Sequence, residues 1–205
     1  MFLKSSERIT ASMSAILLAL LVALPTSAQT QQPVVNSRAQ VQVDYQKQVK
    51  AYLDMRNKLD GTLPNLSKDS NPTELDKHER ALAALMATAR KNAKLGDIFN
   101  PSISAFIKTE LEKLFSGPDR RKTLKSILDE SGQREIKLSV NGRYPDDVPL
   151  STMPTYVLDM LPPLPDKTLE YRFISRRLIL LDVASHLVVD YIENALPAIQ
   201  KGAPL

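Results

Sequence analysis

The acidic residues Asp182 and Asp190 flank His186 at intervals of four residues, and Glu193 follows them closely. Side chains four residues apart share one face of a helix, where they would suit binding a cation or orienting the imidazole as a general base. Asp182, His186 and Asp190 are therefore the candidate site. The same spacing is typical of the polar side of an amphipathic helix, and two carboxylates with one histidine make an incomplete zinc site. We favour this solvent-exposed interpretation over a catalytic one.

The element that carries these residues decides between the interpretations. Apolar side chains at positions 183, 187, 188, 191 and 192 form one broad arc, which predicts a last helix capped by Asp182. The β-branched residues at 188–189 also permit a third strand. In a strand, His186 and Asp190 would lie about 13 Å apart. The cluster would then be too spread out to act as one site.

Two further positions have the residue types for chemistry. His78 falls between Leu75 and Leu82 on the apolar stripe of a predicted helix, so we expect a partly buried histidine with satisfied hydrogen bonds. Asp146 and Asp147 are adjacent in a proline-rich loop. They fit one half of a carboxylate pair for glycoside cleavage, but they are more typical of turn formers.

Several classes of chemistry are excluded by composition. The chain of 205 residues has no cysteine, which removes disulfides, thiol nucleophiles and iron–sulfur clusters. Its nearest pair of glycines, Gly132 and Gly142, is too widely spaced for a glycine-rich nucleotide loop. No serine stands in a Gly-x-Ser-x-Gly or Ser-x-x-Lys pattern. We therefore expect no cofactor and no metal, and the sequence favours a protein that is not an enzyme.

The N-terminus has the pattern of an export signal. Lys4 and Arg8 precede an apolar run at 15–24, which ends at a proline and a group of small residues. This predicts a signal peptide cleaved between Ala28 and Gln29. The alternative, a permanent membrane anchor, needs about 20 apolar residues, and this run is little more than half as long. We expect a periplasmic or secreted protein without stable membrane insertion after cleavage.

The charge of the chain is weakly positive, with a formal net charge of +4. Short basic runs occur at 120–122 and at Arg176 and Arg177. Such runs are usually solvated surface, but clustered cations also raise the local potential enough to attract anionic polymers or lipid head groups. The predicted partner is therefore an unknown protein or an anionic envelope polymer. Nucleic acid is disfavoured by the modest charge and by export.

Helices are predicted in the first half of the chain. Apolar residues recur there at intervals of three and four, in segments separated by glycines and prolines. Two helix starts are clearly marked, because Asn71 precedes Pro72 and Asn100 precedes Pro101. Asparagine caps the first turn, and proline fits there because it lacks the amide hydrogen that would be left unpaired.

The pattern changes to strands in the second half. Alternation at 136–140, followed by Asn141 and Gly142, predicts a strand and a tight turn. The proline-rich stretch that follows has room for a short edge strand at 156–160. Alternation at 169–173 and an apolar run at 178–181 then predict an antiparallel hairpin whose second strand is buried on both faces.

Two regions also carry short, distinctive patterns. They are Gly-Asp-Ile-Phe at 96–99 with Pro101, and, further on, Tyr-Arg-Phe at 171–173, Arg176, Asp182 with Val183, and Val189 with Asp190. In these stretches the chain resembles a family of uncharacterised exported bacterial proteins. The resemblance covers most of the chain after the leader and implies no assigned activity, because the shared motifs are structural. The chain differs from the family pattern at the predicted hairpin turn, where Ser175 and Arg177 replace the usual Gly and Asp.

The predicted organisation has four consecutive parts. They are a signal peptide at 1–28, a flexible remnant at 29–40, a helical part at 41–132, and an antiparallel sheet part with a terminal helix at 133–205. The fold class is α+β, with N-terminal helices packed on a small antiparallel sheet and a C-terminal helix, in one continuous core.

The absence of a complete catalytic set directs the functional expectation. We expect an exported envelope protein with a binding or structural role. The alternative is an envelope hydrolase that uses acidic residues and His186. An enclosed cleft around Asp146, Asp182, His186 or Asp190 would favour the hydrolase.

Overall fold

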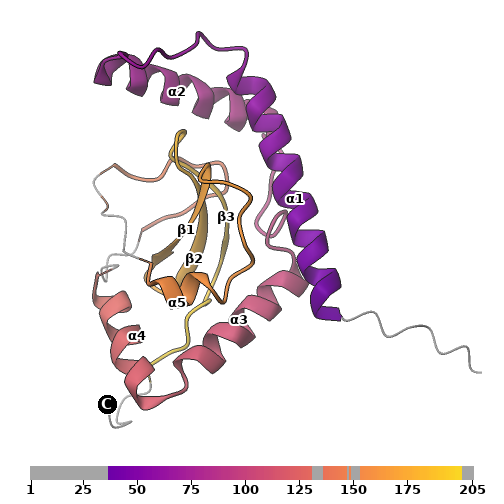
Figure 1. Cartoon of the computed structure of the whole chain (residues 1–205), viewed down its shortest axis with the longest axis vertical. Helices are drawn as coiled ribbons and strands as arrows, with labels where there is room; N and C mark the ends of the chain where they lie inside the picture. Colours follow the sequence, from indigo (N-terminus) through magenta and orange to yellow (C-terminus); the bar gives the residue numbers. More distant parts are fainter. Residues whose placement is uncertain (1–36, 131–135, 147, 149–152, 200–205) are drawn as a thin grey trace, which may run out of the picture. The chain divides into compact units, whose positions relative to one another are not determined.

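The structure is a computed structural model that describes residues 37–130, 136–146, 148 and 153–199. The predicted signal peptide and its cleavage site at Ala28 and Gln29 lie outside the described residues. Helices occupy the first half of the described chain and a three-stranded antiparallel sheet the second (Figure 1). The α+β fold class predicted from the sequence is confirmed.

Four longer helices form the helical part: α1 (Ser37–Asp60), α2 (Pro72–Ala89), α3 (Pro101–Phe115) and α4 (Pro118–Glu130). The first begins at Ser37, so residues 37–40 are helical and the flexible remnant was predicted too long. The first turn is held to α3, because Arg38 forms an ion pair with Glu110 at 3.3 Å and lies over the ring of Phe106 at 4.9 Å. Contacts between residues so far apart in the chain produce no local pattern, so the Gln-rich sequence did not indicate that this turn is helical.

The two predicted helix starts are confirmed. Asn71 Oδ1 accepts a hydrogen bond from the Glu74 amide at 3.0 Å, and Glu74 Oε2 accepts one from the Asn71 amide at 2.9 Å. This reciprocal pair is a capping box. Asn100 Oδ1 accepts from the amides of Ser102 and Ile103 at 3.0 and 3.1 Å. Each cap contributes about 1 kcal/mol by satisfying amides that lack helical partners.

The sheet has the strand order β1 (Leu169–Ile174), β2 (Arg177–Asp182) and β3 (Leu187–Ile192). The predicted hairpin of β1 and β2 is confirmed, and Ser175 takes the left-handed turn position with φ of 52°. The predicted C-terminal helix is wrong, because residues 187–192 form β3 and bear out the third-strand alternative. A strand buried on both faces shows no period of two, so its apolar residues also fit a helical arc.

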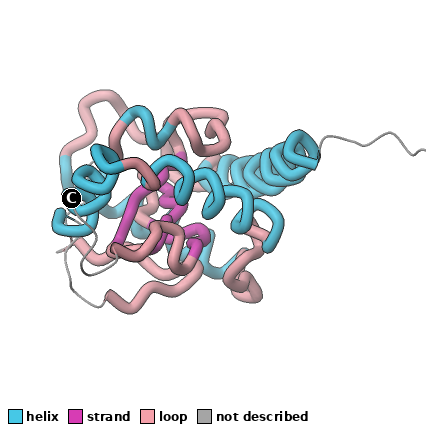
Figure 2. The backbone as a smooth tube through the Cα atoms, turned by 90° about the horizontal axis from the view of Figure 1, so that it is seen from below, coloured by secondary structure: helices cyan, strands magenta, loops and turns pink. Residues whose placement is uncertain are grey.

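Alternate residues of the sheet pack into two separate apolar clusters. The helical cluster joins one face to the helices, and its sheet members are Leu169, Tyr171, Phe173, Leu178, Leu180, Leu187, Val189 and Ile192. The second cluster lies on the other face, and its members are Tyr144, Ile174, Ile179, Leu181 and Val188, with Ile136, Leu138, Val148 and Tyr191 packed against them. Figure 2 shows the strands surrounded by helices and loops. Strand β2 is therefore buried on both faces, as predicted.

The segment that covers the second face also closes one edge of the sheet. The Asn141 amide donates to Val188 O at 2.9 Å, the Val188 amide to Gly142 O at 2.9 Å, and the Tyr144 amide to His186 O at 2.7 Å. The predicted strand at 136–140 is wrong, because residues 136–139 form no strand and the backbone contacts with β3 begin at Asn141, within the turn. Pairing this edge removes backbone groups that would otherwise invite another strand.

The Asn-Gly turn itself is present. Asn141 has φ of 61°, and the Gly142 amide donates to Ser139 O at 3.0 Å. A Cβ at Gly142 would lie 2.2 Å from the Ser139 hydroxyl oxygen and 2.9 Å from its carbonyl oxygen. Glycine is therefore required here by space.

Residues 155–158 form the short helix α5 (Thr155–Leu158) instead of the predicted edge strand at 156–160. Pro154 occupies the cap position, and Val157 enters the core. The fixed φ of proline suits a helix start, which the strand prediction did not weigh. Within the residues that the structure describes, no helix is both long and apolar enough to cross a membrane.

Candidate functional site

Asp182, predicted on a solvated face, is fully buried at the end of β2. Its Oδ2 accepts hydrogen bonds from the Tyr52 hydroxyl at 2.8 Å and from Arg56 Nε at 3.2 Å, both on α1. Its Oδ1 accepts from the Ser185 amide at 3.2 Å. Asp182 thus fastens the sheet to α1 through a buried ion pair. Burial, with the nearby charge of Asp182 as a second cause, holds the pKa of the Tyr52 hydroxyl well above its usual range.

Asp190 is also fully buried, in β3. Its Oδ2 accepts hydrogen bonds from the amides of Ile98 and Phe99 at 2.9 and 2.8 Å. Its Oδ1 accepts from the amides of Gly96 and Tyr191 at 3.1 and 2.8 Å. The carboxylate therefore organises the connection between α2 and α3, where Gly96 has the left-handed φ of 90°. The solvated-face prediction is wrong for Asp190 as well.

His186 lies at the turn between β2 and β3, and its side chain is 41% exposed. Its Nδ1 is 3.6 Å from Asp146 Oδ1, and both residues line a pocket of about 140 Å³. Arg143 Nη2 donates to Asp146 Oδ1 at 3.0 Å, and this hydrogen bond is the main cause that lowers the pKa of the Asp146 carboxyl. Asp182, His186 and Asp190 do not form one site. The structure instead pairs His186 with Asp146, which no local pattern could show.

The two buried carboxylates are engaged by groups of the chain and are closed off from solvent. Asp182 and Asp190 accept three and four hydrogen bonds from other groups of the chain. The pocket shared by Asp146 and His186 is smaller than the volume of roughly 300 to 1,000 Å³ that is usual for ligand sites. In the part of the chain that the structure describes, no three His, Asp or Glu side chains are grouped to hold a metal ion.

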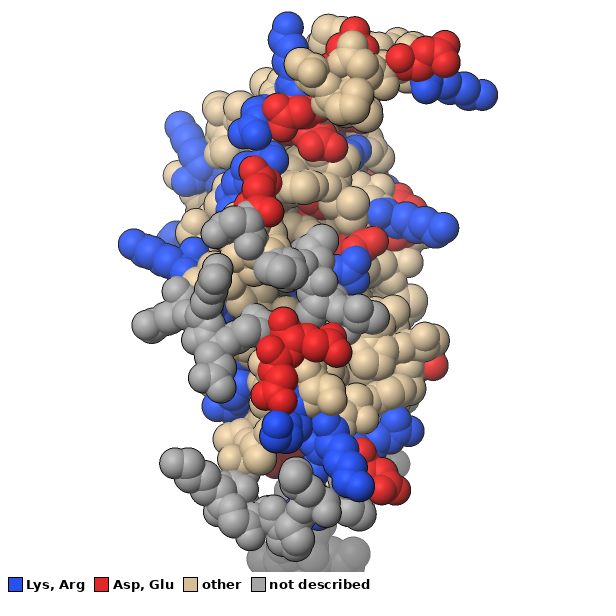
Figure 3. Space-filling view, turned by 90° about the vertical axis from the view of Figure 1, so that its left-hand side faces the viewer, with Lys and Arg blue, Asp and Glu red and all other residues tan. Residues whose placement is uncertain are grey.

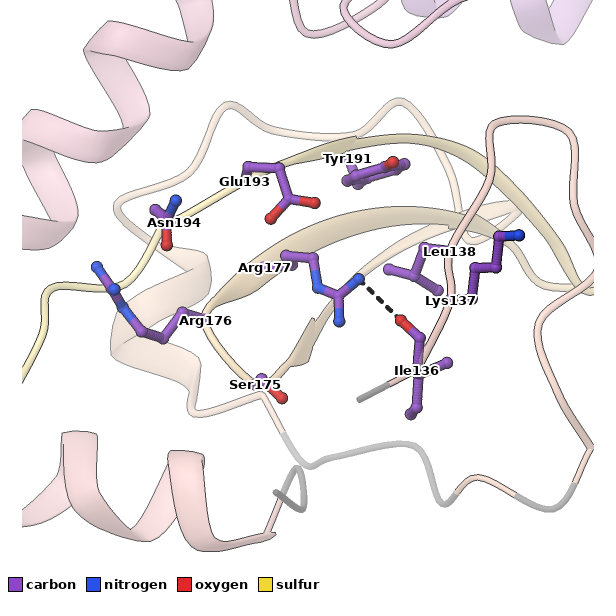
Figure 4. Close-up of a pocket in the computed structure, with 9 residues that line it drawn as sticks. All are labelled: Ile136, Lys137, Leu138, Ser175, Arg176, Arg177, Tyr191, Glu193 and Asn194. Atoms are coloured by element: carbon purple, nitrogen blue, oxygen red, sulfur yellow. Dashed lines mark hydrogen bonds between the residues drawn. The ribbon is translucent and has the colours of Figure 1, made fainter. Parts of the chain in front are cut away.

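A cleft of about 680 Å³, which we call the cationic cleft, is formed by described residues of the sheet and of the segment before the Asn-Gly turn. It lies where the 136–138 segment faces the start of β2 and the end of β3 (Figure 4). Its lining residues are Ile136, Lys137, Leu138, Ser175, Arg176, Arg177, Tyr191, Glu193 and Asn194. Three of these side chains are cationic and one is anionic, so the cleft carries a positive charge.

Backbone contacts fix the two arginines of the cleft. Arg177 Nη1 donates to Ile136 O at 2.9 Å, which is the dashed contact in Figure 4. Arg176 Nε donates to Leu196 O at 2.9 Å. Each guanidinium has five N–H donors, so one such contact leaves most of them for a ligand. The arginines are therefore pre-positioned, while the exposed Lys137 adds a mobile charge at the rim.

The sequence indicated two of the three cationic residues of this cleft. Arg176 and Arg177 were recognised as a basic run, but Lys137 is distant in the chain and joins them only through the fold. The other basic run lies on α4, where the Arg120 guanidinium stacks over the Tyr156 ring at 4.0 Å. On the face drawn in Figure 3, Lys and Arg are interspersed with Asp and Glu, as on an ordinary solvated surface.

A second cavity, of about 370 Å³, lies at the corner between α1 and α2, and we call it the corner pocket. Its lining residues are Leu63, Pro64, Asn65, Leu66, Ser67, Ser70, Glu74, Lys77, His78 and Ala81. The His78 side chain is 15% exposed, and its Nε2 lies 2.9 Å from Asp60 Oδ1. The prediction of a partly buried histidine with a satisfied hydrogen bond is confirmed.

Comparison of the chain with models of protein families, with curated proteins and with solved structures finds no match. The fold and the cavities therefore carry the functional argument. They define an α+β domain in which Asp182 and Asp190 hold the fold together and a cleft of about 680 Å³ is lined mainly by cations among its charged residues.

Proposed function

We propose that this chain is an exported, non-catalytic binding protein that holds an anionic envelope polymer in the cationic cleft. The observation that carries the proposal is the grouping of Lys137, Arg176 and Arg177 around one cavity of about 680 Å³. Guanidinium groups pair with carboxylate and phosphate oxygens through two parallel hydrogen bonds. Clustered positive charge also attracts a polyanion from a distance.

The shape of the cleft supports a polymer over a compact ion. Apolar side chains of Ile136, Leu138 and Tyr191 belong to the second apolar cluster and also line the cavity. An aromatic ring beside fixed cations suits repeating units that combine an apolar face with an acidic group. Ser175 and Asn194 add polar groups to the lining. One cleft therefore offers charge, stacking and hydrogen bonds together.

Binding is favoured over the alternative of an envelope hydrolase. Of the acidic residues considered for hydrolysis, Asp182 and Asp190 are fully buried and accept three and four hydrogen bonds from the chain. Asp146 and His186 share only the pocket of about 140 Å³. A buried carboxylate that accepts several hydrogen bonds is a poor general base, because its lone pairs are already engaged.

A charge-reversal experiment tests the cleft. The probe is fluorescently labelled poly-L-glutamate, with uncharged dextran as the control polymer, and the readout is the dissociation constant at low and physiological salt. We expect Lys137→Glu to weaken binding about 3- to 10-fold at low salt, the effect of one partly screened charge pair. Lys47→Glu, an exposed lysine on α1 with the same change of charge, is the matched control.

The proposal fails if both substitutions weaken binding equally, because the interaction would then depend on net charge alone. It also fails if dextran binds as tightly as poly-L-glutamate.

Location is tested separately by mass spectrometry of the protein from its native cells. Export requires a mature N-terminus at Gln29 in the envelope or medium, and an intact Met1 in cytosolic protein contradicts it.

A further inference from the structure

An open strand edge forms one side of the cationic cleft. Along the outer edge of β3, backbone pairing extends to Val188, whose amide donates to Gly142 O and whose carbonyl accepts from the Asn141 amide, both at 2.9 Å. Beyond this point, Tyr191 and Glu193 line the cleft, and Figure 4 shows them along one side of the cavity. Within the described residues, no strand pairs with this part of the edge.

The register of the sheet shows which backbone groups face the cleft. In an antiparallel pair, the N–H and C=O of one residue point to the same side, and the side alternates along the strand. Val188 is opposite Leu181 of β2, and it directs its backbone groups away from β2. Tyr191 is opposite Ile179, two residues away in the same strand, so it has the same orientation. Glu193 follows two residues later, and its amide therefore also points outward.

Two of these outward groups are left for a ligand. The Tyr191 amide donates to Asp190 Oδ1 at 2.8 Å, which leaves the Tyr191 carbonyl. In the described part of the chain, neither this carbonyl nor the Glu193 amide has a hydrogen-bond partner. One residue of a parallel strand donates to such a carbonyl and accepts from such an amide, because its partners are two residues apart.

We propose that the cationic cleft binds an acidic peptide in extended conformation, which adds to β3 through the Tyr191 carbonyl and the Glu193 amide. Addition of a strand to an open sheet edge is a general mode of peptide recognition, in which main-chain hydrogen bonds supply affinity and alternate side chains supply specificity. The inference rests on the proposed function and names the class of polymer.

The cations of the cleft fit the side chains of such a strand. Its side chains alternate between the two faces of the sheet, so every second one lies on the face of Tyr191 and Ile179, which belong to the second apolar cluster. Arg177 precedes Ile179 by two residues in β2 and shares this face. Its Nη1 donates to Ile136 O at 2.9 Å, and the exposed Lys137 lines the same cleft. Acidic side chains at every second position therefore meet cations.

The backbone distinguishes a peptide from an acidic polysaccharide. A strand repeats its outward amide and carbonyl about every 6.6 Å, the length of two residues. A polyuronate carries comparable charge but has no such series of amides. It would therefore satisfy the cations and leave the strand edge unpaired.

The test compares poly-L-glutamate with polygalacturonate of matched length and charge, by fluorescence titration at low salt. Poly-L-glutamate is expected to bind about 10-fold or more tightly, the effect of two added backbone hydrogen bonds. Equal affinity, with Lys137→Glu weakening both, would overturn strand addition and leave the proposed polymer binding standing. If neither polymer binds, the proposed function fails and this inference fails with it.

Two substitutions at one position isolate the donor of the edge. Glu193→Gln and Glu193→Pro remove the same charge, but only proline removes the amide hydrogen. The glutamine variant is expected to bind poly-L-glutamate more tightly than the parent protein, because a like charge is lost. The proline variant is expected to bind about 5-fold more weakly than the glutamine variant. Equal affinities, with similar thermal midpoints, would overturn the contact at the Glu193 amide.

A change in the ligand tests the Tyr191 carbonyl, which no substitution removes. Acetylated hexaglutamate is compared with the same peptide methylated at every backbone nitrogen, so that the charge and the protein are unchanged. The methylated peptide is expected to bind at least about 5-fold more weakly, because it has no backbone amide hydrogen to donate. Unchanged affinity would overturn strand addition, whether or not Glu193→Pro folds.

Discussion

Asp182 and Asp190 are both fully buried carboxylates of the sheet, yet their surroundings neutralise them in different ways. Asp182 faces a formal cation, Arg56, together with the Tyr52 hydroxyl, both side chains of α1, and one backbone amide, that of Ser185. Asp190 accepts hydrogen bonds from backbone amides only, and three of the four amides belong to the connection between α2 and α3. One charge is balanced by an ion and the other by aligned dipoles.

The difference bears on what each contact can tolerate. A buried ion pair costs much of its Coulombic gain in desolvation, so apolar residues of similar size can often replace the whole pair. Amides cannot be replaced by substitution, and they remain buried when their acceptor is removed. The stability of the region around Asp190 should therefore depend on this one side chain. Around Asp182, apolar residues should be able to replace the ion pair as a whole.

The sharpest test removes Asp190. We expect Asp190→Ala to lower the free energy of unfolding by about 4 kcal/mol, because the buried amides of Ile98 and Phe99 and the partly buried amide of Gly96 lose this acceptor. For a domain of this size, that corresponds to a fall in melting temperature of roughly 10 °C. Urea unfolding followed by circular dichroism measures the free energy, and thermal unfolding measures the melting temperature.

Asp97→Ala is the matched control in the same connection. Asp97 is exposed, and its Oδ2 accepts a single hydrogen bond from the Lys94 amide at 2.9 Å. Its removal should cost less than about 1 kcal/mol. Equal losses for the two variants would show that the connection tolerates any loss of acceptor, and would remove the distinction drawn for Asp190.

The second test compares partial with complete removal of the ion pair. Asp182→Ala leaves Arg56 and the Tyr52 hydroxyl without their acceptor, and we expect a loss of about 2 to 3 kcal/mol. The loss is smaller than at Asp190 because Arg56 also lies 3.5 Å from Asp60. The triple variant Tyr52→Phe, Arg56→Met, Asp182→Leu should recover most of that stability.

The comparison between single and triple variants is decisive for the ion pair. A triple variant that is less stable than Asp182→Ala would show that the pair contributes more than its desolvation cost. The two buried aspartates would then be equally indispensable. Chemical unfolding with a shared urea dependence ensures that the variants are compared as two-state folders.

Local signals allowed the helical half to be predicted. Asn71 and Asn100, each followed by proline, mark helix starts within a few residues, so no distant contact is needed to recognise them. The hairpin of β1 and β2 was likewise recognisable, because apolar residues alternate at 169–173 and a short polar turn separates them from the apolar run at 178–181. Signals within one turn or one hairpin survive in a single sequence.

The burial of Asp182 and Asp190 could not be predicted, because it depends on contacts with residues that are distant in the chain. The partners of Asp182 on α1 are 126 and 130 residues away, and Asp190 meets amides more than 90 residues away. Spacing by four made both residues look like one helical face, and β3 shows no alternation because both of its faces are covered. Local spacing cannot separate a solvated carboxylate from one that is satisfied by a distant segment.

A milder test uses the tyrosines near each aspartate. Burial is the main cause that holds the pKa values of Tyr52 and Tyr45 above the ordinary value of about 10, and Asp182 adds to the effect at Tyr52. Above about pH 10, the unfolded chain releases these protons while the folded chain keeps them, so stability falls as pH rises. Each tyrosine contributes a slope of up to about 1.4 kcal/mol per pH unit.

Phenylalanine variants separate the two contributions. Tyr52→Phe and Tyr45→Phe should each flatten the alkaline loss of stability, measured by urea unfolding between about pH 8 and about pH 11. Below the unfolded-state pKa, their effect should be independent of pH. A variant as steeply destabilised by alkali as the parent protein would show that its hydroxyl ionises equally easily in the folded and unfolded chains.

The smallest effect is expected at a third aspartate, which extends the comparison to the surface. Asp146 is 58% exposed, and its Arg143 hydrogen bond lowers its pKa, so any stability it adds is present at neutral pH and lost as pH falls through the folded value. Water and salt screen this pair. Asp146→Asn should therefore leave the melting temperature unchanged at physiological salt and lower it detectably only at low salt. The contrary result is a salt-independent loss of stability as large as that of Asp182→Ala. It would mean that the stability contributed by an aspartate of this protein does not depend on its burial.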